Sequence, residues 1–143
     1  MRYIYVTLLT ALFFNSCSYK DKENTTKKEK KQFETYERSE MASMMLFMFD
    51  FNMQLKAEIE AGKSVSTFPD NFKQLSQLKM TSGHIKDDFF EQHLDTFLAY
   101  QKEVFDKPNS RVENFNAMVQ SCIACHQVKC TGPISKIEKL FIR

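Results

Sequence analysis

The chain has few of the residues that interrupt helices, with only 3 Gly and 3 Pro among its 143 residues. No stretch alternates apolar and polar residues with the period of two that is typical of a strand. The sequence therefore predicts an all-α protein. A hydrophobic content of 43%, which includes 14 Phe and 8 Met, is sufficient for one sizeable core and indicates a single folded domain.

Other absences exclude classes of function. The chain has four cysteines, and no second C-x-x-C pair and no H-x-x-x-H motif accompanies the pair at Cys122 and Cys125. A structural zinc site usually needs two such ligand pairs, so zinc is not expected. The net charge is only +2, and the folded part has no basic stripe interleaved with aromatic residues. We therefore expect no nucleic-acid partner.

The only long apolar run, residues 3–14, is too short to span a bilayer and ends in small or polar residues. It has the form of a signal peptide covering residues 1–16. The following Phe14-Asn15-Ser16-Cys17 resembles a bacterial lipoprotein box, which implies lipidation at Cys17. The alternative is an ordinary secretory signal cleaved nearby, with Cys17 incidental or removed. Both interpretations predict export.

Residues 18–31 contain six lysines and no apolar periodicity, which is typical of a solvated spacer. We therefore expect a lipid-anchored flexible linker at residues 17–33 and a folded domain at 34–143. Residues 1–31 carry seven Lys or Arg and three acidic residues, whereas the remainder is slightly acidic. A basic arm on a nearly neutral body indicates a membrane tether.

Apolar residues recur at three- and four-residue steps in four stretches, which predicts four helices. The expected helices run from about Glu34 to Ala61, from Pro69 to about Gly83, from about Lys86 to Asp106, and from the capping box that begins at Ser110 to the motif at Cys122. Short connections favour antiparallel neighbours, so the predicted architecture is an up-down-up-down four-helix bundle. The end of the fourth helix would then lie beside the starts of the first and third.

The run Cys122-Ile123-Ala124-Cys125-His126 is the one motif whose chemistry follows from residue order. Two cysteines three residues apart lie on one helical face, where each thiol can add across a haem vinyl group, and the adjacent imidazole reaches the iron from the same side. The alternatives are a redox-active cysteine pair, which should open a helix in a chain with strands, and half of a zinc site. The motif predicts one covalent haem c.

A C-x-x-C-H motif near the end of a predicted four-helix bundle resembles the class II c-type cytochromes, the cytochrome c′ family. The resemblance covers residues 34–126. It implies thioether bonds at Cys122 and Cys125 and an axial iron ligand at His126. It also implies a distal residue in the first helix, where a Met gives a six-coordinate iron and a non-ligating residue leaves a site open for NO or CO.

Met41 and Met45 are the candidates for the distal ligand. Matching Tyr36 to an aromatic residue of the family gives Met41, and counting helical turns gives Met45 equally well. Methionines at helical spacing are usually core residues, so at most one of them is expected to bind iron.

Three other side chains are weaker candidates for the haem site. His84 and His93 are the rivals for the distal ligand, and His93 lies at the margin of the apolar face of its helix, where a surface or hydrogen-bonded histidine is expected. Arg38 is a candidate partner for a haem propionate.

The chains of class II c-type cytochromes typically end soon after the C-x-x-C-H motif, whereas this chain continues to Arg143. The spacing of Ile134, Ile137 and Leu140 predicts a short amphipathic helix folded back on the bundle end. The basic residues after the motif are Lys129, Lys136, Lys139 and Arg143. They favour two interpretations equally: a docking surface for an acidic partner, or a solvated face. Cys130 is left as an unpaired thiol.

Together these features predict an exported, membrane-tethered monohaem cytochrome that transfers single electrons with a His/Met-ligated iron, and that is not an enzyme. It is expected in the periplasm as a lipoprotein of the cell envelope, with redox proteins of that envelope as partners. The alternatives are a five-coordinate protein of the cytochrome c′ kind that binds NO or CO, and a haem-free interaction module. The oligomeric state stays open.

Overall fold

The computed structural model describes residues 37–143. The predicted signal peptide, Cys17, the linker at 17–33 and the first three residues of the predicted folded domain lie outside the described residues.

Every element in residues 37–143 is helical, which confirms the all-α class. In chain order the elements are α2 (Glu40–Glu60), η2 (Asp70–Gln77), α3 (Asp88–Asp106), η3 (Pro108–Ser110), α4 (Arg111–Lys129), α5 (Ile134–Ile137) and η4 (Glu138–Leu140), where η denotes a 3-10 helix. No helix in this part of the chain combines the length and the apolar character needed to cross a membrane.

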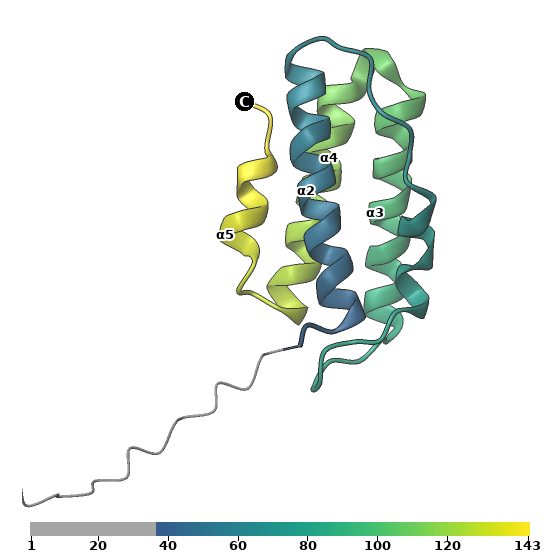
Figure 1. The fold of residues 1–143 in the computed structure, drawn as a ribbon, viewed down its shortest axis with the longest axis vertical. Helices are drawn as coiled ribbons and strands as arrows, with labels where there is room; N and C mark the ends of the chain where they lie inside the picture. The colour runs from purple at the N-terminus through teal and green to yellow at the C-terminus, as the bar shows by residue number, and fades with distance from the viewer. Residues whose placement is uncertain (1–36) are drawn as a thin grey trace, which may run out of the picture. The chain divides into compact units, whose positions relative to one another are not determined.

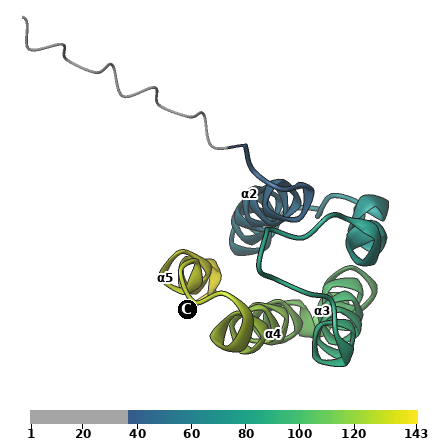
Figure 2. The ribbon, with the colours of Figure 1, turned by 90° about the horizontal axis from the view of Figure 1, so that it is seen from below.

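The three long helices α2, α3 and α4 run along the long axis of the domain, and α4 runs opposite to α2 and α3 (Figure 1). Seen end-on, α2, η2, α3 and α4 surround a common core, and α5 lies outside this ring beside α2 and α4 (Figure 2). The fully buried core side chains come from all four elements of the ring, and the apolar ones include Phe72, Phe115, Leu55, Leu75, Met118 and Val104.

The first helix begins at Glu40, so its predicted extension back to Glu34 is wrong for residues 37–39, which are not helical. The helix starts there because the Ser39 hydroxyl accepts a hydrogen bond from the backbone N–H of Ala42 at 3.0 Å. Its end agrees with the sequence: Gly62 takes a φ of +62°, and its N–H donates to the Ile59 carbonyl at 3.0 Å.

The second predicted helix is a 3-10 helix of 8 residues, so the expectation of an α-helix to about Gly83 is wrong. Phe72 and Leu75 are 0% and 1% exposed, and their three-residue spacing places both on one side of a helix with three residues per turn. Leu78 is already extended, with a ψ of 143°. An i, i+3 apolar pattern fits α- and 3-10 helices alike, which is why the sequence did not separate them.

The third helix buries the apolar face that the sequence predicted, and Asp87 caps it by accepting a hydrogen bond from Phe90 N–H at 3.0 Å. The capping box predicted for the fourth helix is wrong, because the Ser110 side chain makes no capping hydrogen bond. The 3-10 turn η3 leads into α4 instead, and Arg111 Nε donates to the Val104 carbonyl at 2.9 Å.

The predicted C-terminal helix is present as α5 and η4. Ile137 and Leu140 are its buried residues, and the segment contacts both α2 and α4. The chain therefore continues past the C-x-x-C-H motif and packs back onto the helices that carry the predicted site.

Candidate haem site

A cavity of about 430 Å³ lies where α4 ends and α2 begins, within the size range of small-molecule and cofactor sites. All six residues predicted to bind the cofactor line it: Arg38, Met41, Met45, Cys122, Cys125 and His126. The structure thus brings together residues that are about eighty positions apart in the sequence. Their role toward a haem stays a prediction.

Most of the remaining cavity wall is apolar, with contributions from Leu46, Met48, Phe49, Phe90, Ile137 and Leu140. Among residues 37–143, the charged residues of the wall are all cations, namely Arg38, Lys129 and Lys136, and none is Asp or Glu. Such a lining fits a large apolar group that also carries carboxylates, because the apolar surface removes the group from water while the cations pair with its acids.

His126 has the hydrogen bonding that a metal-binding imidazole requires. Its Nδ1 lies 3.0 Å from the backbone carbonyl oxygen of Cys130. A carbonyl can only accept, so Nδ1 carries the proton and donates, and this tautomer leaves the Nε2 lone pair available for a metal. The turn that ends α4 thereby fixes both the tautomer and the direction of the ring.

The two motif cysteines are free thiols in an apolar environment. Burial raises the pKa of Cys122 to about 12, with a smaller contribution from the neighbouring Cys125. Burial also raises the pKa of Cys125, although the charge of Lys129 opposes this shift. A redox-active C-x-x-C pair depends on a lowered thiol pKa, so the raised pKa values of Cys122 and Cys125 give no support to that alternative.

The methionines divide into those at the cavity and those elsewhere. Met41 is 5% exposed and Met45 is half-buried, and both line the cavity. Met48, one of the four methionines at positions 41–48 in the first predicted helix, also lines it. Met80 lines it as well, and sequence reasoning did not include Met80. Met80 lies in the loop between η2 and α3, outside any helical pattern, so no periodicity in the sequence could have indicated it.

That loop reaches the cavity because hydrogen bonds connect it to the start of α2. The Met41 N–H donates to the Lys79 carbonyl at 3.1 Å, and the Lys79 N–H donates to Glu40 Oε2 at 2.7 Å. The hydroxyls of Ser39 and Thr81 lie 2.8 Å apart. These contacts attach the loop to the start of α2 and place Met80 beside the first turn of α2.

The two rival histidines differ in position. His84 lines the cavity, but its Nε2 lies 3.0 Å from the Lys129 carbonyl and its Nδ1 lies 3.4 Å from the Ser82 carbonyl. His93 is not among the lining residues; its Nδ1 donates to the Phe89 carbonyl at 2.8 Å and its ring stacks on Phe89. Neither ring therefore presents a free nitrogen to the cavity in this arrangement.

Asn52 is a lining residue that sequence reasoning also missed. The side chain is 2% exposed, and Nδ2 donates to the Met48 carbonyl at 2.9 Å. Within residues 37–143 its Oδ1 has no hydrogen-bond partner. A buried amide oxygen of this kind is costly unless a bound water or ligand donates to it.

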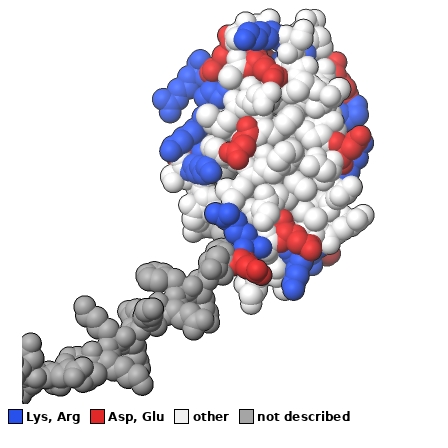
Figure 3. Space-filling model, viewed as in Figure 1, with Lys and Arg blue, Asp and Glu red and all other residues white. Residues whose placement is uncertain are grey.

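Two cations of the predicted docking surface have partners within the domain. Lys129 Nζ lies 2.5 Å from Asp87 Oδ2, and this hydrogen bond lowers the pKa of Asp87. Lys136 Nζ lies 4.3 Å from the centre of the Phe49 ring. Lys and Arg side chains still gather along the left edge in Figure 3, the side on which α5 lies.

Comparison of the chain with protein-family models, curated proteins and solved structures finds no match. Within the described part of the chain, no three His, Cys, Asp or Glu side chains converge on a point where a metal ion could bind.

Proposed function

We propose that the protein is an exported c-type cytochrome similar to the class II cytochromes, with one haem attached to Cys122 and Cys125 and bound through its iron by His126. The observation that carries the proposal is the composition of the cavity. The C-x-x-C-H motif lines one apolar cavity together with Arg38, Met41 and Met45. These three residues are distant from the motif in the sequence and were predicted from it to bind the same cofactor.

The residues present fit this group. The thiols of Cys122 and Cys125 would attach the group, and His126 Nε2 together with Met41 or Met45 would bind its iron. Arg38 is exposed at the cavity and Lys136 lies on its C-terminal side, where each can pair with a propionate. Bound there, a haem supplies a one-electron Fe(III)/Fe(II) couple.

The chain's own residues favour electron transfer over reaction chemistry. The Cys130 carbonyl accepts a hydrogen bond that orients the His126 ring, and most of the cavity lining is apolar. Within the part of the chain that the structure describes, the cavity wall has several thioethers and no carboxylate that could act as a general acid or base. We therefore infer an electron carrier, not an enzyme, that is anchored to the membrane by a lipid at Cys17 and serves redox proteins of the cell envelope.

We also propose that the helical ring is this chain's version of the antiparallel four-helix bundle, with η2 in the place of the second helix. In support, each of α2, η2, α3 and α4 contacts its two neighbours around the ring. Phe72 of η2 packs against the rings of Phe51 and Phe97, with ring centres 5.5 and 6.0 Å apart, so η2 fills the position between α2 and α3.

The alternative is a five-coordinate protein that binds NO or CO, which differs from the carrier in having no methionine at the sixth position of the iron.

Visible and near-infrared spectra of the exported protein in both redox states test the proposal. A His/Met carrier is low-spin in both states and shows the weak near-infrared band of Met-to-iron ligation when oxidised. A high-spin spectrum with uptake of CO favours the alternative. Absence of any haem absorption, in protein from a host that attaches haem to C-x-x-C-H motifs, contradicts both.

A further inference from the structure

The C-terminal residues 130–143, here called the C-terminal wall, form one side of the cavity. The wall contributes Cys130, Pro133, Lys136, Ile137 and Leu140 to the lining. It covers the outer side of the α2 and α4 pair (Figure 2). Without it, the apolar faces of these two helices at the cavity would meet water.

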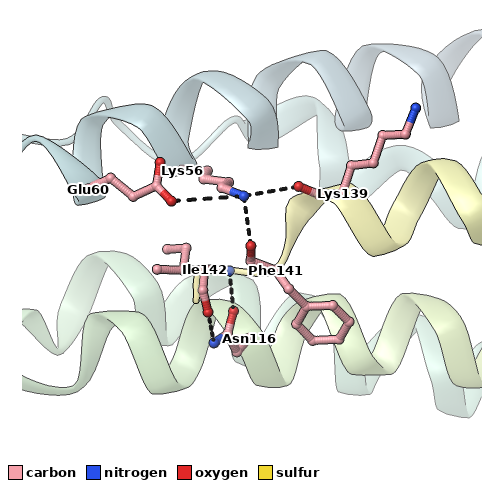
Figure 4. A network of polar contacts seen from close by, with 6 residues as sticks. All are labelled: Lys56, Glu60, Asn116, Lys139, Phe141 and Ile142. Atoms are coloured by element: carbon pink, nitrogen blue, oxygen red, sulfur yellow. Dashed lines mark hydrogen bonds and ion pairs between the residues drawn. The ribbon is translucent and has the colours of Figure 1, made fainter.

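One anchor of the wall is Asn116 on α4. Its Nδ2 donates to the Ile142 carbonyl at 2.9 Å, and its Oδ1 accepts from the Ile142 N–H, also at 2.9 Å (Figure 4). A single amide thus satisfies both backbone groups of one residue, as a neighbouring strand would. This reciprocal pair fixes the direction of the chain end as well as its position.

The second anchor is Lys56 on α2. Its Nζ donates to the carbonyls of Lys139 at 3.0 Å and Phe141 at 2.7 Å, and it lies 3.9 Å from Glu60 Oε1 (Figure 4). The Lys56 side chain is largely buried by these contacts. The end of the wall is therefore attached to both helices that it covers.

The start of the wall is attached to the predicted iron ligand, because the carbonyl of Cys130 accepts the hydrogen bond from His126 Nδ1. Neither Asn116 nor Lys56 lines the cavity. Outside their own helices, the hydrogen bonds of these two side chains all go to the wall.

We propose that the C-terminal wall seals the haem from water, and that Asn116 and Lys56 are positioning residues that keep it closed. The inference rests on the proposed function. An oxidised iron carries one more positive charge than a reduced iron and gains more from water, so a sealed site has a higher reduction potential than an open one. Loosening either anchor lowers that potential while the axial ligands stay in place.

The test is Asn116→Ala in the full haem-loaded chain, with Asn114→Ala as the matched control. Asn114 lies on the same helix but donates to the Glu103 carbonyl, away from the wall. Loss of two hydrogen bonds should speed backbone hydrogen exchange in residues 134–143 by about tenfold or more. The reduction potential should fall, with an unchanged visible spectrum. Exchange equal to the control, or faster exchange at an unchanged potential, overturns the proposal.

Lys56→Met is the second variant, which keeps the aliphatic stem and removes the donor, in case Asn116→Ala fails to fold. Its control is Lys102→Met, because Lys102 forms an exposed ion pair with Asp106 on α3, within one helix. The same two readouts apply, with the same outcomes for or against.

If the proposed function is wrong, the purified full chain will contain no haem, and this result is distinguishable from a failure of the wall proposal. The wall is then tested by the rate at which a thiol reagent alkylates Cys122. Faster alkylation in Asn116→Ala than in Asn114→Ala supports a wall that closes the cavity. Equal rates overturn it.

Discussion

His126 Nδ1 donates a hydrogen bond to the backbone carbonyl of Cys130 at 3.0 Å. The predicted iron ligand is therefore oriented by the first residue of a segment that extends beyond the haem motif. The contact uses the backbone carbonyl of Cys130, so the thiol has no part in it. Cys130 itself is exposed.

Cys130→Ser should leave the haem spectrum and the haem content unchanged, because the serine keeps the carbonyl that orients His126. The measurement is the visible spectrum beside that of His126→Ala, which should lose its low-spin character. A changed spectrum in Cys130→Ser alone would show that the thiol itself acts at the site.

The sixth ligand is predicted to be Met41 or Met45. Replacement of the true ligand by Ala should give a high-spin iron that binds CO, because a vacated position is open to exogenous ligands. Met53→Ala is the control, since Met53 is exposed and does not line the cavity. If only Met80→Ala changes the spin state, the ligand comes from the loop and the first-helix prediction fails.

Phe72→Ala should destabilise the protein by about 3–5 kcal/mol, because a fully buried ring leaves a cavity when it is removed. Denaturant unfolding measures the change. Phe47→Ala is the matched control: Phe47 contacts the Phe72 ring but is 46% exposed, so its loss should cost clearly less. Equal losses would contradict the position of η2 in the core.

The pKa of Cys122 gives a pH prediction for the chain without haem. Burial raises the pKa from its ordinary value of 9.0 to about 12, so the folded state favours the protonated thiol. The resulting stability is complete below pH 9.0 and is lost as the pH rises toward about 12, because the unfolded chain releases its proton first.

Thermal unfolding between these pH values measures the effect, and Cys122→Ala should reduce it. In protein with haem attached the thiol is consumed, so the Cys122 contribution should disappear. An identical pH dependence with and without haem would contradict attachment at this residue.

The all-α class and the shared helical face of the motif cysteines could be predicted from the sequence, because both depend on the spacing of residues close together in the chain. The apolar spacing of Phe90, Leu94 and Phe97 determines which face of α3 is buried, and the spacing of Cys122 and Cys125 determines which face they share. These patterns needed no knowledge of the tertiary structure.

The remaining features depend on long-range contacts that leave no local pattern. Met80 reaches the cavity because hydrogen bonds attach its loop to α2. Asn52 stands out only because its buried Oδ1 has no hydrogen-bond partner among the described residues, which the sequence does not reveal. The anchors Asn116 and Lys56 appear in the sequence as ordinary polar residues of helices. Their function depends on where the chain end returns.

The central claim is that one haem is covalently attached at Cys122 and Cys125. Its most direct test is the intact mass, under denaturing conditions, of the full chain from a host that attaches haem to C-x-x-C-H motifs. The account predicts the polypeptide plus one haem, the same result for Cys130→Ser, and the polypeptide alone when Cys122 and Cys125 are both replaced by Ser. A wild-type chain at the polypeptide mass, with Cys122 and Cys125 free to react with alkylating reagent after denaturation, would contradict it.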